Sequence, residues 1–136
     1  IIQLIDHFFF FYYSDGSKAN DNGNGLRYFD FERLKQISLG DPVFEKDLLT
    51  DYMIDAEHKL QMLKDLFTAN DLHKIIDTAH TLKGSSYSVG AKIVGDEALG
   101  IEVSAKNNDL GNIEIRISKL SKAVTETKEI LKDKLL

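Results

Sequence analysis

The chain has 136 residues, of which 43% are hydrophobic and 29% charged, and its formal net charge is −5. This length suits one domain with a single core, and the composition is that of a globular rather than a disordered protein. The absence of cysteine excludes disulfides and thiolate metal sites, and a negative charge without a basic cluster argues against nucleic acid as a partner.

The first thirteen residues are strongly apolar and include an unbroken aromatic run from Phe8 to Tyr13. They are too short for a membrane span, which needs roughly 20 residues, and they lack the basic region and cleavage site of a signal peptide. Two interpretations stay open: a segment that docks on the domain or a neighbouring chain, or the remnant of a longer receptor. Residues 14–25 are typical of a glycine- and asparagine-rich linker. We therefore expect a leader and linker at 1–25 and a compact domain at 26–136.

The domain opens with a short predicted helix at about 30–38, which Gly40 ends. Asp41 and Pro42 then form a strong helix start, an N-cap acceptor followed by proline at the first helical position. The apolar residues that follow are spaced mostly by four and predict a helix of some seven turns that ends near Ala69. They are Phe44, Leu48, Tyr52, Ala56, Leu60, Leu63 and Phe67.

A second long helix is predicted from a cap at Asn70 or Asp71 to Gly90, with Leu72, Ile75, Ala79, Leu82 and Ser86 facing inward. A third runs over about 91–106, with Val94, Ala98, Ile101 and Ala105 inward. Gly95 and Gly100 inside it each cost about 1 kcal/mol relative to alanine, and we expect them to allow close packing.

The last helix follows a turn at 107–109, and its inward positions alternate steps of four and three: Ile113, Ile117, Leu120, Val124, Thr127 and Leu131. Such spacing suits helices that pack at small crossing angles. Four long amphipathic helices joined by short turns predict an all-α fold. We expect an antiparallel up-down-up-down four-helix bundle with a short additional N-terminal helix.

The second long helix carries the run Ala79-His80-Thr81-Leu82-Lys83-Gly84-Ser85-Ser86. At 100° per residue, His80 lies about 120° from the middle of the apolar arc, so its imidazole is expected at the solvent edge. Lys83 and Gly84 follow three and four residues later on the same side. Ile76 and Tyr87 extend this patch.

These residue types suit phosphoryl transfer. An exposed imidazole is mostly neutral at neutral pH and therefore nucleophilic. Lys83 offers a flexible cation to phosphoryl oxygens, and Gly84 leaves room for a partner to close over the ring. Ser86 faces inward, where we expect its hydroxyl to bond a carbonyl one turn earlier. The chain has neither an aspartate trio for magnesium nor a glycine-rich nucleotide loop, which favours a phosphoryl carrier without its own cofactor.

A lone histidine at a helix edge is more often simply solvated, and the other three histidines do not indicate a functional site. His7 lies in the leader and His58 is off the apolar stripe of its helix. His73 precedes His80 by two turns with Asp77 between them, but a zinc site there would lack a third strong ligand. We expect no metal site. Asp77 is expected to tune the local charge or to contact a partner.

The run resembles the phosphoacceptor signature of histidine-containing phosphotransfer domains, His-x-Leu-Lys-Gly-Ser-Ser. The resemblance covers the chain from about Asp30 onward, and Glu102 matches an acidic position of the third long helix. It implies that His80 is the phosphoacceptor, with Lys83 stabilising phosphoryl charge. The pair Ser85-Ser86 favours a multistep phosphorelay over the related domain of chemotaxis kinases.

The resemblance also implies partners. His80 would take a phosphoryl group from the phospho-aspartate of a hybrid histidine kinase's receiver domain and pass it to a response regulator. The receiver would supply magnesium and dock on Ile76, Asp77, Gly84 and Tyr87. The bundle itself would not contact a membrane, and its location would be cytoplasmic, whether free-standing or at the cytoplasmic end of a membrane-bound hybrid kinase.

Two other classes of function remain as alternatives. One is a helical adaptor that binds receiver domains without accepting phosphate, against which an intact His80 beside Lys83 argues. The other is a bundle enzyme or a dimerising kinase core, which would need a nucleotide-binding domain or a second acid-base group. The chain holds neither of these.

Overall fold

The computed structural model describes residues 28–136, so the expectations for the leader and linker at 1–25 lie outside the described residues. The described part is helical throughout, as the sequence predicted. Its elements are α3 (Phe31–Ser38), α4 (Pro42–Thr68), α5 (Leu72–Val89), α6 (Lys92–Lys106) and α7 (Leu110–Leu135). Within it, no helix is both long and apolar enough to cross a membrane.

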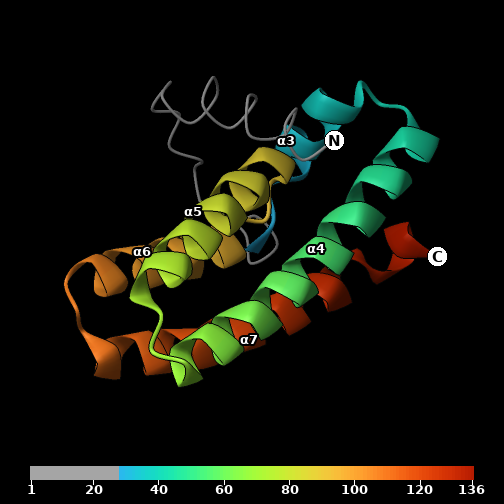
Figure 1. Ribbon diagram of the computed structural model, residues 1–136. Coiled ribbons are helices and arrows are strands. Elements are labelled where there is room, and N and C mark those ends of the chain that lie inside the picture. The colour runs from blue at the N-terminus through green and yellow to red at the C-terminus, as the bar shows by residue number, and fades with distance from the viewer. Residues whose placement is uncertain (1–27) are drawn as a thin grey trace.

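The four long helices form the predicted antiparallel bundle (Figure 1). Each packs against its neighbours in the chain, and α4 also packs against α7, which closes the bundle. The short helix α3 lies at one end and contacts α4 and α5. Because α5 and α6 are antiparallel and joined by a tight turn, their middle residues face each other across one interface.

Aspartates start four of the five helices in residues 28–136, because each carboxylate accepts hydrogen bonds from backbone N–H groups that have no partner inside the helix. The caps are Asp30 for α3, Asp41 for α4, Asp71 for α5 and Asp109 for α7. The sequence left the start of α5 open between two residues, and the structure assigns it to Asp71, whose side chain accepts from the backbone of Lys74.

Gly90 ends α5 with a φ of 99°, a conformation that residues other than glycine rarely adopt. Its carbonyl accepts a hydrogen bond of 2.8 Å from the backbone N–H of Asp30. A Cβ atom at this position would collide with the carbonyl oxygen of Asp30. Gly90 therefore both stops α5 and lets the start of α3 lie directly on the turn.

The core follows the predicted stripes closely. The largest buried side chains come from every long helix and include Leu49, Leu63, Ile75, Leu82, Ile101, Ile113, Leu120 and Leu131. The predicted stripe of α4 omitted Leu49 and Met53, which are buried, and it departs from the structure at its ends, where Phe44 is exposed and Phe67 is partly buried. Both lie near the ends of α4, where fewer neighbouring helices remain to cover a side chain.

The two glycines within α6 do allow close packing. A Cβ atom on Gly95 would lie 2.5 Å from the ring of Tyr87 on α5, and one on Gly100 would collide with the side chain of Arg116 on α7. Both side chains lie across α6 because glycine leaves its backbone uncovered. The helix still runs without a break from Lys92 to Lys106.

Candidate functional site

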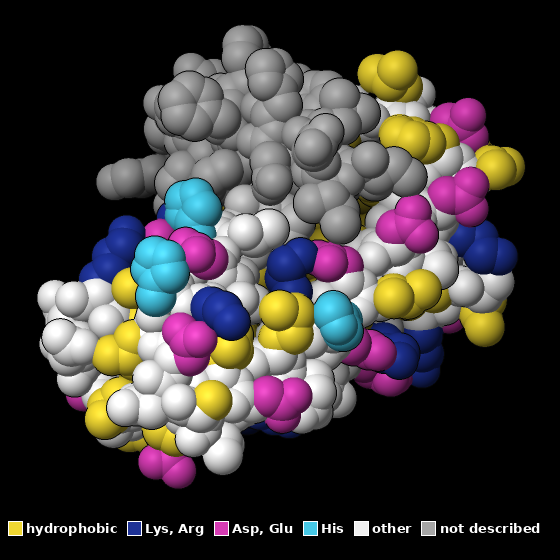
Figure 2. Space-filling view, in the orientation of Figure 1, with side chains coloured by type: hydrophobic (Ala, Val, Ile, Leu, Met, Phe, Trp, Pro, Cys, Tyr) yellow, Lys and Arg dark blue, Asp and Glu magenta, His cyan; other side chains and the backbone are white. Residues whose placement is uncertain are grey.

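His80 lies in the middle of α5, at the helix edge that the sequence predicted. Its side chain is 63% exposed, although Ala79 and Leu82 beside it are completely buried. The surface view shows histidine side chains standing out over α5 (Figure 2). The backbone of His80 is therefore held by the core while the imidazole is open to a partner.

Glu102 of α6 binds the imidazole from the other side of the interface. Its Oε2 atom lies 3.0 Å from Nδ1 of His80, and its Oε1 atom accepts a hydrogen bond of 2.8 Å from Nζ of Lys83. Lys106, one turn further along α6, donates to Oε2 at 3.2 Å. The Glu102 side chain is only 4% exposed. The buried carboxylate of Glu102 therefore contacts His80, Lys83 and Lys106 at once.

The pKa of Glu102 shows which influence dominates at this site. Burial alone would raise it, because a charged carboxylate loses its hydration. Hydrogen bonds from Lys83, Lys106 and His80 outweigh burial together, and the pKa of Glu102 is lowered below its ordinary value. Glu102 is therefore ionised at neutral pH.

An ionised carboxylate can only accept hydrogen bonds, so Nδ1 of His80 must carry a proton to make this contact. In a neutral imidazole the other nitrogen, Nε2, then has the free lone pair. The contact with Glu102 also orients the ring. His80 is therefore an exposed side chain that carries its proton on Nδ1 and has its nucleophilic lone pair on Nε2.

The remaining predicted site residues are only partly as expected. Asp77 is exposed, as a contact residue should be, and lies 3.7 Å from Nε2 of His73. Ile76 is partly buried against the core. Tyr87 packs on Gly95, and its hydroxyl donates to Asp96 of α6. These last two side chains help to hold α5 on α6 as well as bordering His80.

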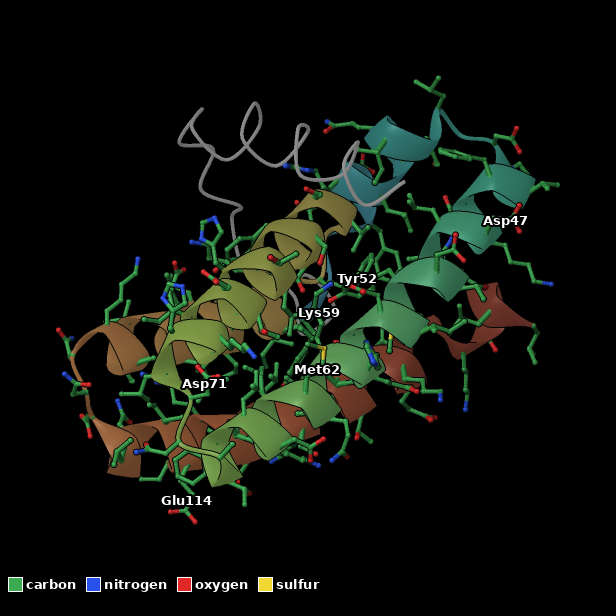
Figure 3. All side chains as sticks on the ribbon, in the orientation of Figure 1. Asp47, Tyr52, Lys59, Met62, Asp71 and Glu114 are labelled. Atoms are coloured by element: carbon green, nitrogen blue, oxygen red, sulfur yellow. The ribbon has the colours of Figure 1, made fainter. Side chains whose placement is uncertain are left out.

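Gly84 is not the open position that the helical wheel predicted, since it is buried and its carbonyl accepts a hydrogen bond from Ser88. A helical wheel considers one helix alone, whereas burial depends on how the rest of the fold packs around that helix. The hydroxyl of Ser86 also differs from expectation. It bonds Tyr52 of α4 at 2.6 Å (Tyr52 is labelled in Figure 3). Burial of Tyr52 raises the pKa of its hydroxyl, so this link is between neutral groups.

The zinc alternative finds no support among residues 28–136, where no three histidine, cysteine or acidic side chains are grouped to hold a metal ion. The His73 side chain is 87% exposed and faces Asp77, while His80 binds Glu102. The two imidazoles therefore have separate carboxylates rather than a shared ligand set. His58 is exposed on α4.

The contact between His80 and Glu102 was not predicted from the sequence, and neither was the place of Lys106. A signal was present, because Glu102 adjoins Ile101 in a helix whose predicted inward residues are all apolar. An acidic residue at such a place is expected to have a cationic partner. The partner's identity depends on how α5 and α6 pack.

The chain is similar to known proteins over most of its length. The family model of the Hpt domain matches residues 47–130. The phosphorelay intermediate protein rdeA of Dictyostelium discoideum is 34% identical over 105 residues, which are 77% of this chain. Those residues are 41% of rdeA, so the chain spans about two-fifths of that relative's length.

Solved structures show the same fold. Histidine-containing phosphotransfer protein B of Pseudomonas aeruginosa superposes with a TM-score of 0.75 at 22% identity, covering 79% of this chain and 94% of that one. A histidine-containing phosphotransfer protein of maize gives a TM-score of 0.72 at 18% identity, covering 98% and 93%. At such identities the likeness concerns the arrangement of the helices.

Proposed function

The chain belongs to the Hpt domain family, and on this premise we propose that it carries a phosphoryl group on His80 between receiver domains of a multistep phosphorelay. The observation that carries the proposal is the contact of 3.0 Å between Nδ1 of His80 and the buried Glu102. It leaves Nε2 as the nucleophile on an exposed ring. Phosphorylation is accordingly expected on Nε2.

The transfer step needs no group from this chain other than the ring and its neighbours. The Nε2 lone pair forms a bond to phosphorus, while the bond from phosphorus to the receiver's aspartyl oxygen breaks and leaves its electron pair on the carboxylate. The ring then bears a positive charge and keeps its proton on Nδ1. Glu102 stabilises that charge through the hydrogen bond it already accepts.

Lys83 contributes a second electrostatic effect. Its side chain is 15% exposed and lies against Glu102, so its charge is held beside the imidazole rather than free in solvent. A positive field there favours a developing phosphoryl dianion. Magnesium and the acidic residues that bind it would come from the receiver domain. The chain acts as a carrier in this scheme.

The docking surface for the receivers is proposed to surround His80. Asp77 and the exposed edges of Ile76 and Tyr87 form it on α5, and Val103, which is 48% exposed, adds apolar area on α6. Gly84 is left out of this surface because it is buried. The partners would be the receiver domain of a hybrid histidine kinase and that of a response regulator, and the chain would then act in the cytoplasm.

The test is phosphoryl transfer from a phosphorylated receiver. We expect an acid-labile, alkali-stable phosphoprotein, and His80→Gln should abolish the label without lowering the melting temperature. His73→Gln is the matched control, since it removes an exposed imidazole from the same helix, and it should keep full labelling. Label that persists in His80→Gln would reject the assignment. Receiver binding by an unlabelled wild-type chain would favour the adaptor.

A further inference from the structure

The two lysines contact different oxygen atoms of the buried Glu102 carboxylate. Oε1 accepts a hydrogen bond from Lys83, at 2.8 Å, whereas Oε2 contacts both Nδ1 of His80 and Nζ of Lys106, at 3.0 and 3.2 Å. His80 and Lys106 therefore contact the same oxygen atom of Glu102, which keeps the ammonium group of Lys106 near the imidazole ring.

The surroundings of the two lysines also differ. The side chain of Lys83 is 15% exposed, and that of Lys106 is 58% exposed. A cation with little access to water depends on its carboxylate partner, because an unpaired buried charge is costly. Lys106 is already mostly hydrated, and a contact of this kind contributes little, so it can leave Glu102 easily.

The charges at the site indicate what the more exposed lysine, Lys106, can do. One lysine is enough to neutralise the single negative charge of Glu102. A phosphoryl group adds about −1.5 to −2 charges at neutral pH, and its oxygens then compete with Glu102 for nearby cations. Lys106 has the longer contact, the greater exposure and a flexible four-carbon stem with which to reach them.

We propose that Lys106 moves from Glu102 to the phosphoryl oxygens once His80 is phosphorylated, while Lys83 stays on Glu102, and that this ion pair prolongs the lifetime of the phosphohistidine. The inference rests on the proposed function of His80. The ion pair is complete while the phosphoryl group is bound to Nε2, and hydrolysis must disrupt it as the group leaves the ring. The pair therefore lowers the free energy of the phosphohistidine and slows its hydrolysis.

The experiment uses the full chain phosphorylated chemically with phosphoramidate, so no receiver domain is needed. Phosphorus NMR follows the decay of phospho-His80 and the pH titration of its phosphoryl group. Lys106→Gln should shorten the lifetime about two- to fivefold, the effect of an exposed ion pair. It should also raise the pH at which the phosphoryl group titrates. Lys106→Arg should retain the lifetime of the wild type.

Lys74→Gln is the matched control, since Lys74 is exposed, belongs to α5 and pairs with Asp71 rather than Glu102. It should leave lifetime and titration unchanged. A normal lifetime in Lys106→Gln, together with a shortened one in Lys83→Gln, would overturn the proposal and make Lys83 the contact. Failure of phosphoramidate to modify His80 would reject it as well. The lysine variants could behave as expected although the wild-type chain accepts no phosphoryl group from phosphorylated receivers. That result would reject only the proposed function.

Discussion

The interface between α5 and α6 and the interface between α4 and α7 both carry ion pairs of similar length, yet they use them differently. Lys83 meets Glu102 at 2.8 Å where the carboxylate is 4% exposed, whereas Lys128 of α7 meets Glu57 of α4 at 2.9 Å with both side chains about half exposed. Water screens the second pair much more than the first. The distance between charges therefore says little about their importance until burial is known.

Of the substitutions that test this difference between the two interfaces, we expect Glu102→Gln to have the largest effect. It keeps the shape of the side chain and removes its charge. A hydrogen bond to a charged group contributes about 1.5–3 kcal/mol, so we expect phosphoryl transfer to slow by about 10- to 100-fold. The amide can also present its NH₂ group to Nδ1 and so allow the wrong tautomer. Nitrogen-15 NMR of His80 should show a loss of the preference for a proton on Nδ1. A normal rate with a normal tautomer would mean that Glu102 serves only packing.

Lowering the pH should reduce the contribution of the Glu102 carboxylate to stability. The pKa of Glu102 is lower in the folded chain than in the unfolded one, because three hydrogen bonds outweigh the effect of burial. Its contribution to stability is therefore complete above the unfolded pKa and is lost as the pH falls through the folded pKa. Wild type should lose more stability in this acidic range than Glu102→Gln does, as measured by urea unfolding at several pH values.

Lys83→Ala tests the second partner of the carboxylate. Removal of one electrostatic donor can cost 2.7–4 kcal/mol in a closed enzyme site, but this site is open to water, and we expect about tenfold slower transfer or less. The melting temperature should change little. An unchanged rate at saturating receiver would show that the charge of Lys83 matters only to Glu102.

Gly95→Ala probes the packing that holds the two helices in register. The new methyl group would lie 2.5 Å from the ring of Tyr87, so the ring must move away from Asp96. Overpacking of this kind costs about 1–3 kcal/mol and the better helix propensity of alanine returns about 1, so we expect a net loss of about 1 kcal/mol. Gly111→Ala is the control, because nothing lies within 4 Å of its Cβ position, and it should be neutral or slightly stabilising.

The smallest effect is expected at the exposed interface. Lys128→Ala removes the pair with Glu57 and should lower the free energy of unfolding by less than about 1 kcal/mol, with no change in phosphoryl transfer. Even this difference should shrink when salt is added. A loss as large as that of Gly95→Ala would show that the α4–α7 pair is less screened than its exposure indicates.

Local patterns were sufficient for most of the fold. The helix start at Asp41, the stop at Gly90 and most of the buried stripes depend on residues within a few positions of one another, where capping and helical period act. The edge position of His80 follows from the same period. Each of these features can therefore be worked out on one helix at a time.

Contacts between helices were decided only by tertiary packing. Glu102 is 22 residues from His80 and 19 from Lys83, and no pattern within α5 or α6 says which side chain opposes which. The burial of Gly84 and the bond between Ser86 and Tyr52 have the same origin. The identity of the reactive residue is a property of α5. The tautomer and charge that make it reactive depend on the register between α5 and α6, which the packing of whole helices determines.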